Sequence, residues 1–322
     1  MKAITIDSGN LVWSDVEEET CGPGEVKIQV HATAVNRADL LQAAGGYPPP
    51  PGASEILGLE CGGEIIEVGE GVQRVAVGDE VCALLAGGGY AERVVVPAGQ
   101  VLPIPKGLST VEAAALPEVF ATAYLNLYME ADLSIQEKVV VHAGASGVGT
   151  AAIQLLKGTN NPVFVTVGSA DKIAQCVALG AEGGHDRHDG SFLQAVQAWA
   201  GDDGVDVILD PVGGQYLADN CAALGLGGRL VLIGLMGGVK AELNLGLMMM
   251  KRLRVIASTL RTRPIGEKAT IMDRLYKDVW PRLESGAIKP IIETSIKLAN
   301  ASEAHALIAT DDTVGKVLLT LD

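Results

Sequence analysis

The sequence predicts an α/β protein in which a doubly wound parallel sheet is inserted into a barrel-like β domain. Short strand-like runs separated by glycine and proline fill the first third of the chain. A regular alternation of apolar strands and helices fills the middle, and strand-like runs return near the end. Glycine contributes 40 of the 322 residues. This is well above the usual share of about 7%, and it is typical of a chain rich in tight turns.

The first part of the chain has the pattern of an antiparallel domain. Its expected strands are Lys2–Ile6, Val26–Val35, Gly63–Val68, Asp79–Leu84 and Ala91–Val96. Segments rich in glycine and proline, such as Gly45–Gly52 and Gly87–Gly89, separate them. Short strands joined by such turns are typical of antiparallel sheets and barrels.

From about residue 120 the strands become uniformly apolar, and helices separate them. The expected strands are Lys138–His142, Pro162–Val167, Val205–Asp210, Arg229–Ile233 and Arg254–Ser258. The expected helices are Thr150–Lys157, Asp171–Leu179 and Gln215–Leu224. Buried strands that alternate with helices indicate a parallel sheet covered on both faces.

The last part of the chain returns to the first domain. A helix over Glu267–Glu284 leads to two further strands, Ile291–Leu298 and Lys316–Leu321. We therefore predict that residues 1–119 and 264–322 form one domain and that residues 120–263 form a second, inserted domain.

Composition excludes several classes of function. The 24 basic and 39 acidic residues leave a net charge of −15, which repels phosphate backbones and argues against nucleic-acid binding. No apolar run has the length of a membrane-spanning helix, and the start of the chain lacks the pattern of a signal peptide. The five cysteines are odd in number and widely spaced, so no disulfide framework is expected. These features predict a cytoplasmic protein without membrane or nucleic-acid partners.

The most specific motif is the glycine turn that follows the first apolar strand of the inserted domain. Gly144 and Gly149 occupy the first and third glycine positions of the G-x-G-x-x-G dinucleotide fingerprint. Ser146 stands at the second position, followed by Gly147 and Val148. Small residues there let the backbone approach a pyrophosphate, which binds at the positive end of the helix. Because the turn follows a strand and opens a helix, we interpret it as a dinucleotide site rather than a plain strand-to-helix turn.

Residues after the next strand predict the choice of cofactor. An NAD site places Asp or Glu about 20 residues beyond the glycines, where it accepts hydrogen bonds from the ribose hydroxyls. Gly168 and Ser169 occupy that place here, and Lys172 follows closely. Arg187, after the next helix, is a second candidate cation. The missing acid and the nearby cations predict NADPH, with a merely solvated first-turn lysine as the alternative for Lys172.

Several further segments have a combination of residues that is typical of one enzyme family. They are Ala34–Leu40, Gly46–Ser54, Ile56–Glu60, His142–Gly149 and Gly234–Gly238. With them the chain resembles the zinc-independent quinone oxidoreductases of the medium-chain dehydrogenase/reductase superfamily, which are related to zeta-crystallin. It is most similar to the branch whose human member is induced by a tumour suppressor.

The resemblance implies a Rossmann domain inserted in a GroES-like β-barrel domain, with the active site in the cleft between them. It also implies a homodimer that pairs the strand Arg254–Ser258 across two subunits. An unpaired apolar edge strand promotes association unless it is covered, and this strand has no proline that would interrupt pairing. We therefore expect a homodimer.

Two positions of the resemblance predict a metal-free enzyme. Catalytic zinc needs three Cys, His or carboxylate ligands plus a water. Zinc-containing relatives carry a Cys and a His at the positions of Asn36 and Leu59. The segment 185–189, rich in histidine and aspartate, is interpreted as a solvated loop rather than a metal cluster.

Tyr47, on the loop rich in glycine and proline, is the best candidate for a hydrogen-bond donor to the substrate, and the resemblance also implies a functional tyrosine there. The alternative is a turn tyrosine packed on the following prolines. Asn36 and Asp39 are expected in the cleft, although Asp39 is also a candidate helix cap. Ser146 is expected to affect turnover through cofactor placement. Weaker candidates for cofactor contact, by position in the family, are Thr122, Gly213, Gly234 and Lys316.

Three functions remain open. The first is a metal-free NADPH:quinone oxidoreductase, because hydride transfer to a quinone yields a delocalised anion that needs little polarisation. The second is a 2-enoyl thioester reductase, since that sister family has a tyrosine in the same loop. The third is a non-catalytic NADPH-binding structural or sensor protein, which an intact glycine turn together with Tyr47 disfavours. The net charge of −15 favours an uncharged quinone over an anionic coenzyme A thioester.

Overall fold

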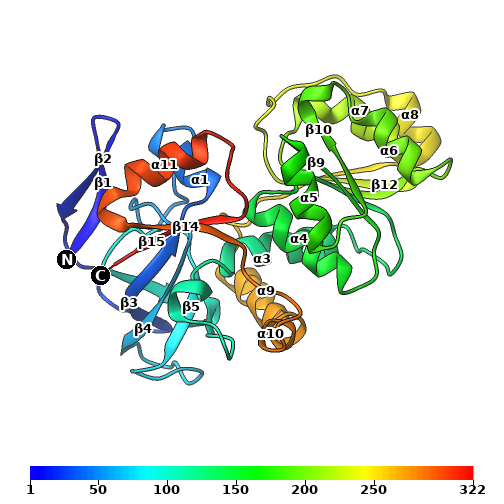
Figure 1. Ribbon diagram of the computed structural model, residues 1–322. Coiled ribbons are helices and arrows are strands. Elements are labelled where there is room, and N and C mark those ends of the chain that lie inside the picture. Colours follow the sequence, from blue (N-terminus) through cyan, green and yellow to red (C-terminus); the bar gives the residue numbers. More distant parts are fainter. Residues whose placement is uncertain (322) are drawn as a thin grey trace. The chain divides into compact units, whose positions relative to one another are not determined.

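The computed structural model describes residues 1–321, and the chain forms two compact units. The first unit contains Met1–Ala121 and the chain from Leu260 onward, and the second contains Thr122–Thr259. Each unit has its own large sheet (Figure 1).

A seven-stranded sheet forms the centre of the first unit. In spatial order its strands are β14 (Ile292–Lys297), β15 (Lys316–Thr320), β3 (Glu25–Ala34), β4 (Glu60–Val68), β5 (Glu80–Leu84) and β7 (Val101–Pro103), while β6 (Arg93–Pro97) pairs with β3. A separate hairpin contains β1 (Lys2–Asp7) and β2 (Asn10–Asp15). Val26, Ile28 and Val30 alternate along β3 and are buried in one apolar core, as expected for a strand whose side chains point to alternate faces.

One pairing differs from the antiparallel pattern that the sequence predicts. Strands β14 and β15 run parallel, because the helix α11 (Ala301–Ala309) connects them. A hairpin can join only antiparallel strands, whereas a parallel pair needs such a crossover. This helix was not among the predicted elements.

The helix expected over 267–284 is two helices, α9 (Ile265–Asp278) and α10 (Trp280–Glu284). Pro281 has no N–H to donate, and its ring would clash with a carbonyl of a continuing helix, so the residue is suited to the first turn of a new one. Two further helices of this unit, α1 (Arg37–Ala43) and α2 (Thr110–Ala113), are short.

The second unit contains a six-stranded sheet in which all neighbouring strands are parallel. In spatial order the strands are β10 (Gly183–Asp186), β9 (Val163–Val167), β8 (Val139–His142), β11 (Val205–Asp210), β12 (Leu224–Leu232) and β13 (Arg254–Ala257). By chain order this is the 3-2-1-4-5-6 arrangement of the Rossmann fold. The order reverses between β8 and β11, and ligands of such sheets bind at the carboxyl ends of the strands there.

Helices join the strands of this second sheet (Figure 1). They are α4 (Gly147–Lys157), α5 (Ala170–Leu179), α6 (Leu193–Ala200), α7 (Leu217–Ala223) and α8 (Leu245–Lys251). The helix α3 (Pro117–Tyr124) spans the boundary between the two units. Apolar residues such as Val140, Ile208 and Leu230 pack with α6 and α7 in one core, which confirms buried parallel strands.

The two edge strands of this sheet relate differently to the sequence. As predicted, β13 is an edge strand, and Met249 and Met250 on the neighbouring α8 are 80% and 81% exposed. The opposite edge, β10, was not expected, because its glycines and polar residues lack a strand pattern. It is held by main-chain pairing with β9. The homodimer through β13 stays a prediction.

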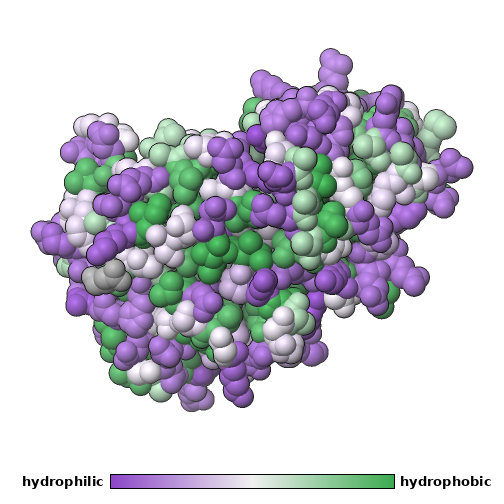
Figure 2. Space-filling view, viewed as in Figure 1, coloured by the Kyte–Doolittle hydropathy of each residue, from purple (hydrophilic) through white to green (hydrophobic). Residues whose placement is uncertain are grey.

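Hydrophilic and apolar residues are mixed over the visible face of the molecule (Figure 2). Among the helices of residues 1–321, none has the length and apolar content that crossing a membrane requires. All five cysteines are free thiols.

Candidate active site

The glycine turn of the second unit lies between β8 and α4. Ser146 is the N-cap of α4, and its Oγ accepts the N–H of Gly149 at 3.1 Å. A Cβ on Gly149 would lie 2.5 Å from the carbonyl oxygens of Ala143 and Gly144, and one on Gly144 would lie 2.7 Å from Val165. Both positions therefore require glycine. Without side chains at these two positions, the main-chain N–H groups at the start of α4 are accessible to a ligand. This turn fits the pyrophosphate of a dinucleotide.

A buried polar network holds the strand end next to this turn. His142 Nε2 lies 2.7 Å from Asn220 Oδ1, and its Nδ1 lies 2.9 Å from Thr166 Oγ1. Asn220 Nδ2 donates to Asp210 Oδ2 at 2.9 Å. Burial lowers the pKa of His142 to about 4, so its ring is neutral at pH 7. A neutral ring donates through one nitrogen and accepts through the other, and the network thereby connects the carboxyl ends of β8, β9 and β11.

The predicted glycines Gly213 and Gly234 follow β11 and β12, at the same carboxyl-terminal edge of the sheet as the glycine turn. Gly213 has φ +79°, and a Cβ there would lie 2.8 Å from Leu235. Its N–H donates to Asp210 Oδ1 at 3.1 Å. Burial raises the pKa of Asp210 to about 6. The two loops pair through main-chain hydrogen bonds, including that from Gly237 N to the carbonyl of Val212 at 2.7 Å.

Four residues predicted to select the cofactor gather at the end of β9. Ser169 caps α5 and accepts the N–H of Lys172 at 3.3 Å. A Cβ on Gly168 would lie 3.5 Å from Nε of Arg187, so the Arg187 guanidinium is near this strand end, while Lys172 has its backbone N–H there. Thr122 lies in α3, where its carbonyl accepts from Asn126 Nδ2 at 2.8 Å, and its cofactor contact stays a prediction.

In the first unit, a buried ion pair connects β15 to β4. Lys316 Nζ lies 2.7 Å from Glu60 Oε1, and the two side chains are 4% and 0% exposed. Lys316 also donates to the carbonyl of Val35 and to Asn36 Oδ1, at 2.9 and 2.7 Å. Asn36 Nδ2 donates to Glu60 Oε1 at 3.0 Å. These bonds use all three ammonium protons, so the cofactor contact expected of Lys316 stays a prediction without a free donor to support it.

Asp39 was expected in a cleft, but its side chain is fully buried. Its Oδ2 accepts the N–H of Asn36 at 2.8 Å and its Oδ1 accepts the N–H of Gly58 at 3.0 Å. Burial raises the pKa of Asp39 to about 6. These contacts agree with the alternative role of Asp39 as a helix cap, since its bond to Asn36 completes a capping box at the start of α1.

Tyr47 is half-buried, and the guanidinium carbon of Arg261 lies 5.3 Å from the centroid of its ring. Arg261 is 3% exposed. Burial and the negative charge of Glu118 raise the pKa of the Tyr47 phenol, while the positive charge of Arg261 opposes the rise. Tyr47 is therefore a protonated hydroxyl at neutral pH, as a hydrogen-bond donor must be.

Glu118, at the start of α3, is a third carboxyl group of the first unit after Glu60 and Asp39, and it is half-buried. Its N–H donates to Glu60 Oε2 at 2.9 Å. Its own Oε2 is buried and has no hydrogen-bond partner in the described part of the chain, residues 1–321. Burial, together with the negative charge of Glu60, raises the pKa of Glu118 to about 8. This carboxyl group is therefore mostly protonated at neutral pH.

Comparison with known proteins agrees with this geometry. Residues 22–106 match the family described as alcohol dehydrogenase GroES-like domain, and residues 147–277 match the family described as zinc-binding dehydrogenase. The quinone oxidoreductase-like protein 2 of Mus musculus is 29% identical, over 97% of this chain and 89% of that protein. The chain belongs to the medium-chain dehydrogenase/reductase superfamily. Within this superfamily of oxidoreductases, it is a quinone oxidoreductase-like member.

Solved structures of the superfamily resemble the whole chain. Escherichia coli quinone oxidoreductase complexed with NADPH is 25% identical, with a TM-score of 0.87 and coverage of 99% of both chains. JamJ enoyl reductase is 26% identical, with a TM-score of 0.89, covering 100% of this chain and 99% of that one. An NAD-dependent alcohol dehydrogenase is 29% identical, with a TM-score of 0.88 and full coverage of both chains.

Some proteins that this chain is similar to are far longer than it is. The highly-reducing polyketide synthase 1 of Aureobasidium melanogenum is 31% identical over 99% of this chain, and the polyketide synthase GfsB of Streptomyces halstedii is 33% identical over 92%. The chain spans only 15% and 5% of the lengths of these two proteins.

In this chain, Asn36 and Leu59 stand at the positions where zinc-containing relatives of the superfamily have zinc ligands. Leu59 is apolar and buried, and the Asn36 amide is bonded to Glu60 and Lys316. Within residues 1–321 there is no group of three or more His, Cys, Asp or Glu side chains that could hold a metal ion. His188, in the segment interpreted as a solvated loop, is 65% exposed and contacts Asp186. Metal independence stays a prediction.

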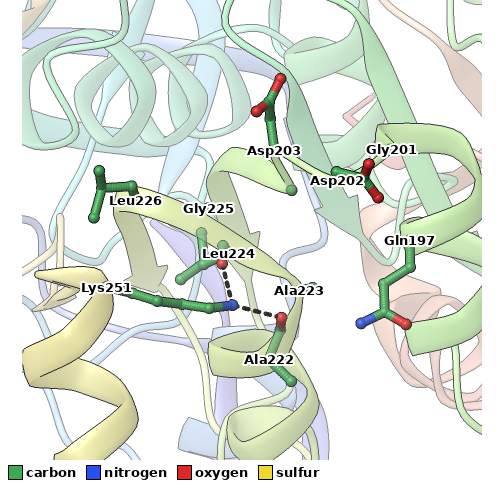
Figure 3. Close-up of a pocket in the computed structure, with 11 residues that line it drawn as sticks. Gln197, Gly201, Asp202, Asp203, Ala222, Ala223, Leu224, Gly225, Leu226 and Lys251 are labelled. Atoms are coloured by element: carbon green, nitrogen blue, oxygen red, sulfur yellow. Dashed lines mark hydrogen bonds between the residues drawn. The ribbon is translucent and has the colours of Figure 1, made fainter.

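The second unit also has a depression of about 560 Å³ that is separate from the glycine turn (Figure 3). Its lining includes Asp203, which precedes β11, and Leu224, which begins β12. It is therefore at the amino ends of these strands, opposite the glycine turn. Lys251 Nζ donates there to the carbonyls of Ala222 and Leu224 at 2.9 and 2.6 Å. These bonds connect α8 to the start of β12 and indicate a structural role.

Sequence reasoning missed Arg261, Glu118 and the partners of His142. Arg261 is 214 residues from Tyr47 in the chain, so no local motif joins them. Glu118 carries no signal except its place between a proline and an apolar helix. The superfamily glycine turn was found because its spacing is local.

Proposed function

We propose that this medium-chain reductase is an NADPH-dependent quinone oxidoreductase that works without a metal. The observation that carries the proposal is the state of the two positions where zinc-containing relatives hold ligands. Asn36 is engaged by Glu60 and Lys316, and Leu59 is buried and apolar. A reductase without a Lewis acid suits an acceptor whose reduced form spreads its negative charge over a conjugated system.

The second unit supports a bound NADPH, which supplies a hydride when present. The glycine turn and the start of α4 would hold its pyrophosphate through main-chain N–H groups and the helix dipole. Ser169, Lys172 and Arg187 would hold the 2′-phosphate, because a hydroxyl and two cations complement a dianion. The network from His142 to Asp210 would keep the neighbouring loops in place.

The chain's own contribution to the chemistry is a positioned donor. The Tyr47 hydroxyl stays protonated at neutral pH, and it would donate to the oxygen on which charge develops during reduction. Similar relatives support this function, including the quinone oxidoreductase-like protein 2 of Mus musculus and the Escherichia coli quinone oxidoreductase.

A second candidate is the reduction of a 2-enoyl thioester. The similarity to polyketide synthases and to JamJ enoyl reductase favours it specifically. Both acceptors are conjugated carbonyl compounds, and both yield a delocalised anion that a single donor can stabilise. The net charge of −15 is unfavourable to coenzyme A and to acidic carrier proteins. We therefore place the quinone first.

The cofactor preference can be tested at Lys172. We expect wild type to bind NADPH at least tenfold more tightly than NADH, about 1.4 kcal/mol. One charge-assisted hydrogen bond, worth about 1.5–3 kcal/mol, is sufficient for this. Lys172→Ala should weaken NADPH binding and leave NADH binding within about twofold. Titration of cofactor fluorescence measures both constants, and Lys157→Ala at the far end of α4 is the control. Equal affinities of wild type for the two cofactors would refute the preference.

The donor role can be tested with Tyr47→Phe. We expect kcat to fall about tenfold with a quinone while KM changes little, because the hydroxyl acts on charge that develops only during hydride transfer. Loss of one donor to a localised oxyanion costs about 10²–10³ in rate, and delocalisation reduces this loss. The assay compares an ortho-quinone, a para-quinone and a short enoyl thioester. An unchanged kcat with all three acceptors would leave Tyr47 a packing residue, and faster turnover of the thioester would establish the second candidate instead.

A further inference from the structure

Arg261 connects three separate segments of the first unit. Its Nε donates to the carbonyl of Ala86 at 2.7 Å and its Nη2 to Gln42 Oε1 at 2.7 Å. Its Nη1 donates to the main-chain carbonyl of Tyr47 at 3.4 Å. Gln42 in turn donates to the carbonyl of Glu55 at 2.9 Å. The loop that carries Tyr47 is therefore held at the end of α1 by one guanidinium group.

In the part of the chain that the structure describes, no carboxylate is hydrogen-bonded to this guanidinium. Buried arginines are usually paired with carboxylates, because an unpaired buried charge is costly. Within residues 1–321, the hydrogen-bond acceptors of Arg261 are two main-chain carbonyls and one amide. The remaining face of the cation lies over the Tyr47 ring, where it is attracted by the π electrons.

The same cation acts on the acidity of the phenol. A positive charge beside a phenol stabilises its anion, lowers its pKa and makes the hydroxyl a stronger donor. Two other charged groups of the unit take part. Glu118 opposes ionisation of Tyr47, and Lys268 Nζ donates to the main-chain carbonyl of Arg261 at 3.1 Å while interacting electrostatically with Glu118.

We infer that Arg261 is a positioning residue for Tyr47, which fixes the ring and strengthens the hydroxyl as a donor to the reduced oxygen of the acceptor. The inference rests on the proposed function, because it concerns the donor step. It assigns Arg261 no contact with the substrate. Its effect on turnover therefore has to pass through the Tyr47 hydroxyl.

A double-mutant cycle tests this dependence. We expect Arg261→Met to lower kcat with a quinone about tenfold, with KM within about threefold of wild type. Arg261→Lys should lower kcat less, because lysine keeps the positive charge and loses only the planar set of guanidinium donors. In the Tyr47→Phe background, Arg261→Met should have no further effect on kcat, since the hydroxyl is already absent. A phenylalanine ring still stacks under the arginine, so a merely structural contribution of Arg261 would persist in that background. Effects that multiply to about a hundredfold would overturn the inference.

A second measurement needs neither cofactor nor turnover. Ultraviolet difference titration of wild type against Tyr47→Phe isolates the ionisation of this phenol from that of the other tyrosines. We expect Arg261→Met to raise the pKa of Tyr47 and Arg261→Lys to raise it less. Arg274→Met, an exposed position on α9, is the matched control and should not move it. An unmoved titration in Arg261→Met overturns the inference, whereas an unchanged kcat in Tyr47→Phe overturns the donor role itself, so the two failures are distinguishable.

Discussion

Replacing Lys316 with methionine is expected to lower the free energy of unfolding by about 3–5 kcal/mol, because it leaves Glu60 buried without its cation. The side chain of Glu60 is 0% exposed, and its Oε1 lies 2.7 Å from the Lys316 ammonium. Methionine is of similar length, so the change removes charge and three hydrogen bonds with little loss of volume. Denaturant unfolding without cofactor measures the loss.

Two comparisons make this result specific. Adding Glu60→Gln to Lys316→Met should recover part of the stability, since the stranded charge disappears. Arg74→Met removes a pair whose side chains are 36% and 62% exposed, Arg74 and Asp273, and should cost less than about 1 kcal/mol. A loss of less than 1 kcal/mol in Lys316→Met would show that water or local rearrangement compensates the charge, contrary to our expectation.

Replacing Glu118 with glutamine is expected to stabilise the protein in alkaline solution. The pKa of Glu118 is about 8 in the folded chain against an ordinary 4.5, first because of burial and then because of the charge of Glu60. Between these two pH values the folded state holds a proton that the unfolded state has lost. Stability therefore falls as pH rises from 4.5 to 8 and this contribution is constant above pH 8.

Glutamine resembles the protonated carboxyl group and has no such titration. The full shift corresponds to about 5 kcal/mol at most, and the partial exposure of Glu118 reduces it, so we expect a gain of about 2–4 kcal/mol at pH 9. The gain should vanish near pH 4.5. Denaturant unfolding over this range measures it, with the exposed Glu242→Gln as the control substitution. A difference between wild type and Glu118→Gln that is independent of pH would contradict the assignment.

Local sequence patterns predicted most of the strands of the second sheet. The alternation of apolar strands and helices predicts a doubly wound parallel sheet, and β8, β9, β11, β12 and β13 occur where it places strands. The strands β8, β9 and β11 are buried along nearly their whole length, so their own residues carry the pattern. The strand β10 was not predicted, because main-chain pairing with β9 rather than a side-chain pattern defines it.

The dinucleotide turn was also readable in advance. Gly144, Ser146 and Gly149 lie within six residues, and their spacing reflects a strand, a tight turn and a helix start in succession. The cations Lys172 and Arg187 were proposed from their places after two elements, and the structure brings the Arg187 guanidinium and the backbone of Lys172 near the end of β9.

The first unit depended on tertiary structure. Tyr47 and Asn36 were recognised from motifs, but Lys316 reaches Asn36 and Glu60 only because β15 pairs with β3 beside β4. Contacts between segments far apart in the chain stack Arg261 on Tyr47 and bury Asp39 completely. They also bury Glu118 Oε2 without a hydrogen-bond partner among the described residues. By itself the sequence determined the fold class, the glycine turn and the superfamily, because short-range spacing encodes them. The charge, burial and partners of the groups around Tyr47 were decided by the tertiary structure, since electrostatic and solvation energies depend on distance in space and not on separation along the chain.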